Sequence, residues 1–124
     1  MKKLLLIVFA ICSFATVNAQ TCKIVGSTDN SSIEVINEYW EKDSTYAVFL
    51  SNDSSTISAN VTVTIEVTYK YGSATKTAQF SGKCKVIALG ETKCQIPVPP
   101  TLSSNSNYKA DSASIISITG NKCQ

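Results

Sequence analysis

One run of residues constrains this chain more than any other. In 58–71, SANVTVTIEVTYKY, apolar and polar side chains alternate from Val61 to Lys70. A period of two is typical of a β-strand with one buried face and one solvent-exposed face. Gly72-Ser73 follows, and this pair suits a two-residue hairpin turn because glycine tolerates positive φ. The run therefore predicts a long strand that turns back into a second strand.

The hairpin turn also predicts a register. It sets four pairs of residues opposite each other: Tyr71 and Ala74, Val67 and Ala78, Ile65 and Phe80, Val61 and Cys84. Apolar side chains meet on one face in this register, which supports it. The next turn signal is ALGET at 88–92, which predicts a second hairpin with Gly90 in the left-handed conformation of a bulge. That hairpin would place Cys84 opposite Cys94.

The cysteines indicate disulfide bonds. Cross-strand neighbours lie close enough for a bridge, so the second hairpin predicts a Cys84–Cys94 disulfide. Cys22 and Cys123 are left, and a bridge between them would tie the two ends of the chain. Four cysteines allow three connectivities, and the sequence alone leaves all three open.

The remaining segments favour an all-β domain. Strands are expected at 32–42, 45–52 and 109–119, and Pro97, Pro99 and Pro100 should end the strand that carries Cys94. Turn signals recur about every ten residues, as in a sandwich of about seven strands. We therefore expect an immunoglobulin-like, two-layer antiparallel β-sandwich, disulfide-stapled and spanning residues 20–124.

The first 19 residues have the pattern of a secretory signal peptide. Lys2 and Lys3 precede a short apolar run, and Val17-Asn18-Ala19 resembles a cleavage site. Removal of this leader leaves nine lysines and nine acidic residues, so the mature domain is nearly neutral. We expect a secreted, extracellular protein, with the periplasm and the endolysosomal lumen as open alternatives. Neutral charge argues against a nucleic-acid partner, which would need a basic surface.

A family resemblance adds a hypothesis about function. Cys22, YAVFLS at 46–51, SANVTVTIEVTYKYG at 58–72, Cys84, CQIP at 94–97 and Cys123 together resemble the ML lipid-recognition domain, the family of Niemann–Pick type C sterol-transfer and phosphatidylglycerol/phosphatidylinositol transfer proteins. The resemblance implies a sterol or phospholipid held between the two sheets. The inward residues that would line such a cavity are Phe49 or its neighbour Val48, Val63, Ile65, Val67, Phe80, Ile96 and Val98. The same residues could equally form a solid core.

A surface-binding module of immunoglobulin-like type is the alternative. Tyr39 and Trp40 are adjacent in an expected strand, so one ring should point outward, where it could contact a carbohydrate or a protein. The simpler interpretation places Trp40 in the core and Tyr39 at the rim. Lipid is thus the leading ligand, with carbohydrate or protein as the alternative partner.

Catalysis is not expected. The chain has no histidine, so the commonest general base is missing, and it has no Cys-x-x-Cys motif for a metal. Glu38, Glu41 and Asp43 cluster near Trp40, and glycosidases use such carboxylate pairs. A solvated strand end is the simpler explanation. We therefore predict a non-enzyme without a cofactor or metal.

Overall fold

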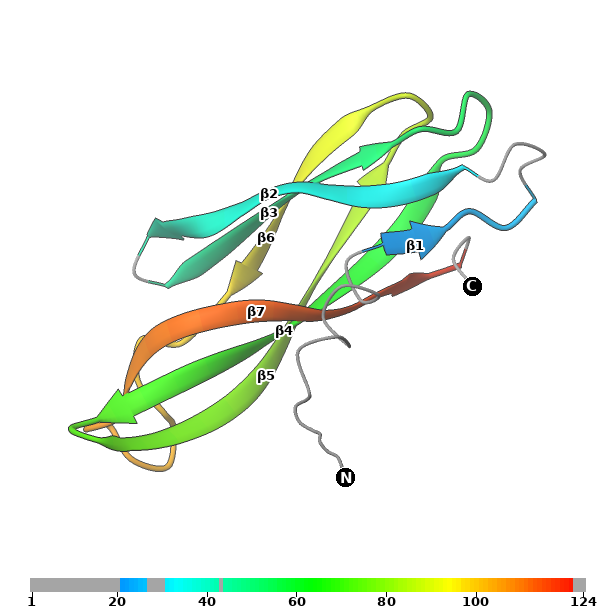
Figure 1. Cartoon of the computed structure of the whole chain (residues 1–124). Helices are drawn as coiled ribbons and strands as arrows, with labels where there is room; N and C mark the ends of the chain where they lie inside the picture. Colours follow the sequence, from blue (N-terminus) through cyan, green and yellow to red (C-terminus); the bar gives the residue numbers. More distant parts are fainter. Residues whose placement is uncertain (1–20, 27–30, 43, 122–124) are drawn as a thin grey trace.

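The chain folds into seven β-strands (Figure 1). The computed structural model describes residues 21–26, 31–42 and 44–121, so the predicted leader lies outside the described residues. In chain order the strands are β1 (Thr21–Lys23), β2 (Ser32–Lys42), β3 (Thr45–Asn52), β4 (Ala59–Tyr71), β5 (Ala74–Val86), β6 (Glu91–Pro97) and β7 (Lys109–Gly120). The expected strands agree with these bounds to within one residue. In this part of the chain no helix is long and apolar enough to cross a membrane.

The strands form two antiparallel sheets, which confirms the all-β class. One sheet has the order β1-β2-β3-β6 and the other the order β5-β4-β7. The alternating apolar residues of both sheets form a single buried cluster. Its largest fully buried side chains are Tyr69, Ile33, Leu50, Ile65, Ile96 and Ile115. Burial of these side chains is the main favourable term in folding, at about 1.5–3 kcal/mol for each large aliphatic residue.

The β4–β5 hairpin confirms the predicted turn and register. Tyr71 pairs with Ala74 and Ile65 with Phe80, as expected. Gly72 has a φ of 61°, the left-handed conformation for which glycine was predicted at this turn. The strongest periodic signal in the sequence therefore determined its own partner strand.

The second predicted hairpin is wrong. β6 pairs along its whole length with β3, where Cys94 lies opposite Val48, and not with β5. The chain reverses at 87–90, but this turn carries it from one sheet to the other. Backbone bonds from the Leu89 amide to the Ser54 carbonyl and from the Asn52 amide to the Gly90 carbonyl, both 2.9 Å, hold the turn against the end of β3. Alternation identified the buried faces of β5 and β6, but not whether these faces belong to one sheet or face each other across the core.

The turn also uses a different residue from the one expected. Leu89, not Gly90, takes the left-handed conformation, with a φ of 55°. Gly90 has another reason to be glycine, because an added Cβ would lie 3.0 Å from the Ile87 carbonyl oxygen and even closer to that residue's side chain. The Gly90 amide donates a 2.9 Å hydrogen bond to the same carbonyl. Leu89 therefore carries the backbone strain of this turn.

Replacing Leu89 with glycine should raise the free energy of unfolding by about 1 kcal/mol, because a left-handed conformation costs other L-residues about 1–2 kcal/mol. The leucine side chain is 71% exposed, so little packing is lost. Thermal unfolding measures the change. The matched control is Gly72→Ala, whose added Cβ meets no atom within 4 Å and which should lose a similar amount through φ alone. A destabilised Leu89→Gly variant would contradict this explanation.

Candidate functional site

One side of the sandwich is bounded by two strands whose outer edges are unpaired. From Val35 onward β2 is bonded on one side only, to β3. β7 is bonded to β4 on one side. On its other side only the start of β7 is bonded: the Ala110 amide donates a 2.9 Å hydrogen bond to the Pro100 carbonyl, and Lys109 bridges to Thr101. The two strands run in opposite directions and their free edges face each other in Figure 1. We call residues 35–42 of β2 and 111–120 of β7 the open side. Each free edge leaves a row of backbone donors and acceptors without a strand partner.

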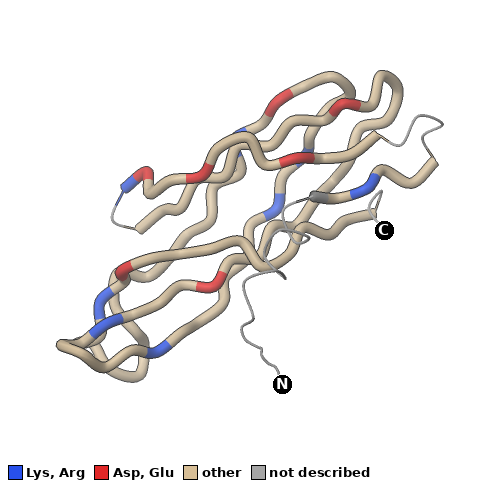
Figure 2. Tube along the Cα trace, in the orientation of Figure 1, with Lys and Arg blue, Asp and Glu red and all other residues tan. Residues whose placement is uncertain are grey.

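The β7 edge is uncharged. Residues 112–120, SASIISITG, contain no charged side chain and no proline, and Figure 2 shows this part of β7 in tan throughout. The other edges carry charges: Glu38, Glu41 and Lys42 on β2, Lys76, Lys83 and Lys85 on β5, Glu91 and Lys93 on β6. Charges on an edge strand oppose the addition of another strand. Bulges at Asp111 and Ile116 leave 112–115 and 117–120 as the regular parts of the β7 edge.

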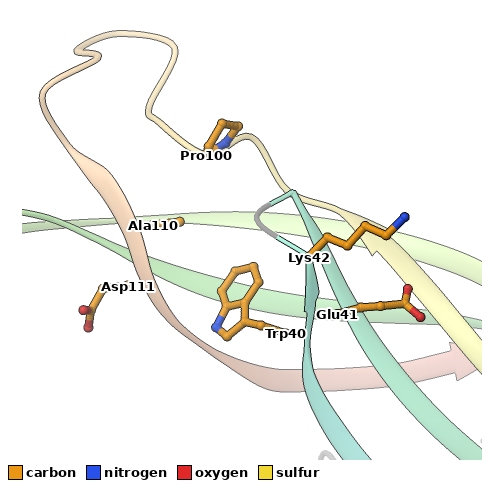
Figure 3. A pocket seen from close by; sticks show the side chains of 6 residues that line it. All are labelled: Trp40, Glu41, Lys42, Pro100, Ala110 and Asp111. Atoms are coloured by element: carbon orange, nitrogen blue, oxygen red, sulfur yellow. The ribbon is translucent and has the colours of Figure 1, made fainter.

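A pocket of about 460 Å³ lies at one end of the open side. Its lining combines Trp40 to Lys42 from the end of β2, Ala110 and Asp111 from β7, and Pro100 from the loop between β6 and β7. In Figure 3 the indole of Trp40 points from β2 toward β7, whereas the side chains of Glu41 and Lys42 point away from it. The lining is therefore mixed: Trp40, Pro100 and Ala110 are apolar, and Glu41, Lys42 and Asp111 are charged.

The inner face of β2 brings three polar and aromatic groups together beside this pocket. Trp40 pairs with Tyr46 of β3, and their rings meet edge to face with centroids 5.1 Å apart. The Tyr46 hydroxyl donates a 2.6 Å hydrogen bond to the Glu38 carboxylate. Burial, and then this hydrogen bond, raises the pKa of Tyr46, so the hydroxyl stays a donor at neutral pH. Glu38 and Trp40 are both half-buried.

A bulge explains why these residues face inward. Val35 pairs with Leu50 and faces the core, but Asn37, not Ile36, pairs with Phe49. The extra residue, Ile36, is 49% exposed. It inverts the alternation of the rest of β2, because strand side chains change face at every residue. For this reason the sequence pattern, which placed Glu38 in a solvated carboxylate cluster, did not predict that this residue faces inward.

The outer face of the larger sheet carries a separate network. Tyr39 stacks on Phe49 with ring centroids 6.3 Å apart. Glu41 accepts hydrogen bonds from the side chains of Lys93 and of Gln95, the latter at 2.5 Å. These two bonds, the Lys93 bond first, lower the pKa of the Glu41 carboxyl. The charge of Glu41 is thus already compensated on the face opposite to Trp40.

The predicted placement of Tyr39 and Trp40 is confirmed in its simpler form. Trp40 packs against the core cluster, and Tyr39 is 37% exposed on the outer face. The expected group of carboxylates does not assemble: Glu38 faces inward and Glu41 outward, and Asp43 lies outside the described residues. Across the described ranges, no group of three potential metal ligands is found.

Five of the proposed lipid-contacting residues are fully buried in the packed core. These are Val63, Ile65, Val67, Ile96 and Val98, none more than 1% exposed. Phe80 is half-buried and packs against that cluster. Phe49 lies on the outer face, where it stacks on Tyr39, because its neighbour Val48 points inward. The set expected to line one cavity is therefore divided between the core and the surface.

Cys84 and Cys94 meet across the two sheets. Both are free thiols in the structure, and a hydrogen bond joins their side chains. This bond lowers the pKa of Cys84, whereas the same bond, together with burial, raises the pKa of Cys94.

Cys84 also lines a second pocket, of about 520 Å³, formed by the ends of β4, β5 and β7. Cys22 is buried, and its predicted partner Cys123 lies outside the described residues.

Comparison of the chain with protein-family models, with curated proteins and with solved structures finds no match. The resemblance to the ML domain stays a prediction, and the function has to be argued from the geometry of the open side.

Proposed function

We propose that this chain is a secreted, non-enzymatic binding module that takes an extended segment of another protein along its open side. The observation that carries the proposal is the uncharged, unpaired edge of β7 at residues 112–120, beside the pocket at Trp40. An edge of this kind binds a peptide as an additional strand: backbone hydrogen bonds provide affinity, and pockets for alternate side chains provide specificity.

The strand order supports this proposal. In an immunoglobulin-like sandwich, strands A, B and E pair in one sheet, and strands C, F and G in the other. The order β2-β3-β6 corresponds to A-B-E, and β5-β4-β7 corresponds to C′-C-F. We propose that the fold is immunoglobulin-like in this sense. Among the described residues no strand is bonded to the side of β7 where strand G would lie, so an added strand would occupy that position.

The alternatives fit the open side less well. A carbohydrate site combines an aromatic ring with several converging polar groups. Beside Trp40 the inward polar groups are Glu38 and Tyr46, which bond to each other, and the side chains of Glu41 and Lys42 point away from Trp40 in Figure 3. A lipid site needs an apolar cavity, and the residues proposed to line one are mostly packed in the core. The protein-binding form of the surface-module hypothesis is therefore preferred to the lipid hypothesis.

Binding can be followed through Trp40, the only tryptophan in the chain. The probes are acetylated nine-residue peptides of alternating serine and valine, each with one lysine at a different position. We expect a saturable change in Trp40 emission with a subset of these peptides. Two further versions of each peptide are made, one N-methylated at the odd-numbered amides and one at the even-numbered amides. Only one of the two versions should lose binding, because an added strand bonds to the edge through the backbone groups of every second residue. Binding that is insensitive to N-methylation, or no binding, would contradict strand addition.

A second copy of the chain is the rival occupant. Sedimentation equilibrium of the full chain distinguishes the two cases. We expect a monomer that remains a monomer when peptide is bound. Self-association that the peptides reverse would show that β7 pairs with another β7, and it would overturn the proposal of a separate partner.

We further propose that Cys84 and Cys94 form a disulfide between the sheets and that Cys22 and Cys123 tie the ends of the chain. The Cys84 thiolate would attack a low-molecular-weight disulfide and release one thiol. The Cys94 thiolate would then displace the second thiol, so that two protein thiols are oxidised and one small disulfide is reduced. The contact between Cys84 and Cys94 and the lowered pKa of Cys84 support the first pairing.

A further inference from the structure

A carboxylate faces the interior of the open side, and no lysine among the described residues forms an ion pair with it. Glu38 lies on the inner face of β2, opposite the core residue Val48. Its hydrogen-bond partner is the neutral hydroxyl of Tyr46, at 2.6 Å. The described ion pairs join Lys70 to Asp111 and Lys93 to Glu41, and neither involves Glu38.

We infer that Glu38, Tyr46 and Trp40 form a subsite for a cationic side chain, a lysine ammonium or an arginine guanidinium, carried by the bound segment. The inference rests on the proposed function and specifies its ligand. A carboxylate can accept several hydrogen bonds, and Tyr46 supplies one donor. A half-buried carboxylate gains most from an ionised donor, because charge-assisted hydrogen bonds are about twice as strong as neutral ones.

Position along the strands supports this inference. Trp40 lies two residues beyond Glu38 on the same face of β2, about 7 Å further along. The pocket at Trp40 is closed on its other side by Ala110 and Asp111 of β7. The Ala110 amide is already bonded to the Pro100 carbonyl, so a segment paired with the free part of β7 would begin beyond Ala110, beside Trp40, and continue toward Glu38. The indole ring offers a cation a second favourable contact, because a cation near an aromatic face is attracted to it.

The other charged residues near the pocket are already paired or point away from it, so Glu38 is the carboxylate that can bind a cation. The Glu41 carboxylate is held by Lys93 and Gln95 on the opposite face of the sheet. Asp111 pairs with Lys70 at 3.3 Å. Lys42 at the pocket rim points away from Trp40 in Figure 3. A basic side chain that enters the open side would thus meet Glu38 as its uncompensated counter-charge.

The test compares matched peptides on the full chain. For each lysine peptide that binds, the same peptide is made with glutamine at the lysine position. At the one peptide position that lies opposite Glu38, we expect the lysine peptide to bind about tenfold more tightly than the glutamine peptide. This factor is typical of the gain from a charge-assisted hydrogen bond. Glu38→Gln should remove this preference while the glutamine peptide binds as before. The control is Glu34→Gln, the same change at an exposed residue of the same strand, which should keep the preference.

Each outcome separates the inference from the proposed function. Equal binding of lysine and glutamine peptides at every position would overturn the cationic subsite and leave strand addition intact. Binding of neither peptide would overturn both. If Glu38→Gln leaves the peptide preference unchanged but causes self-association, Glu38 serves instead to keep the β2 edge from pairing, as inward charges on edge strands do. The last result would also overturn the subsite.

Discussion

Replacing Gly82 with valine should lower the free energy of unfolding by about 3 kcal/mol or more, the upper part of the range for overpacked cores. Gly82 lies on β5 where that strand passes β6 of the other sheet. An added Cβ would lie 2.8 Å from the Ile96 side chain and 2.9 Å from the Gln95 carbonyl oxygen. A backbone oxygen in a paired strand cannot move aside as a flexible side chain can, so the two sheets would have to separate.

Urea unfolding followed by circular dichroism measures the effect of Gly82→Val. Gly82→Ala should cost less, since it adds the Cβ without the branching methyl groups. The control is Gln79→Val on the exposed face of the same strand, which should change stability by less than about 0.5 kcal/mol. If Gly82→Val is as stable as the control, the close approach of β5 and β6 at this residue is wrong.

Removing the proposed inter-sheet disulfide is expected to have a comparable effect. A bridge between Cys84 and Cys94 closes a short loop, and the chain-entropy model assigns it about 3 kcal/mol. The double variant Cys84→Ala, Cys94→Ala should therefore lose about 3 kcal/mol relative to the oxidised protein. It isolates this bridge, because Cys22 and Cys123 are unchanged.

Two measurements separate a disulfide from a thiol contact. Urea unfolding of the wild-type chain and of the double variant, both without reductant, gives the difference in stability. A loss of less than about 1 kcal/mol would indicate thiols that only touch. Peptide mapping without reduction gives the connectivity, because cleavage after Lys83, Lys85 and Lys93 places the two cysteines on different peptides. A Cys22–Cys84 linkage would contradict the proposal.

The sequence predicted local structure well and inter-strand partners unevenly. The run at 58–71 predicted its strand, its turn at Gly72 and its register with β5, all of which the structure confirms. The same reasoning failed at 88–92, where β6 pairs with β3 of the other sheet. A two-residue turn with glycine in the left-handed conformation restricts the chain to one geometry. The longer turn at 87–90 allowed more than one, and bonds to Ser54 and Asn52 decided between them.

The candidate site was predicted only in part. The pair Tyr39-Trp40 indicated that one ring would point inward, and Trp40 does. The expected lipid wall included Phe49, which faces outward, and the expected carboxylate cluster joined Glu38 to Glu41, which face opposite sides. Period two alone excludes the second grouping, because residues three apart on a strand point to opposite faces. The bulge at Ile36 decided that Glu38 is the one that faces inward.

The sequence by itself determined that this chain is all-β, where most strands begin and end, and which face of β4, β5 and β6 is buried. These properties follow from period-two alternation and turn residues, which act between near neighbours. Only the tertiary structure decided which strands share a sheet, that Cys84 meets Cys94 across the core, and that β2 and β7 keep free edges beside Trp40. Those outcomes depend on how two apolar faces close over each other, and strand pairing between distant residues leaves no local pattern in the sequence.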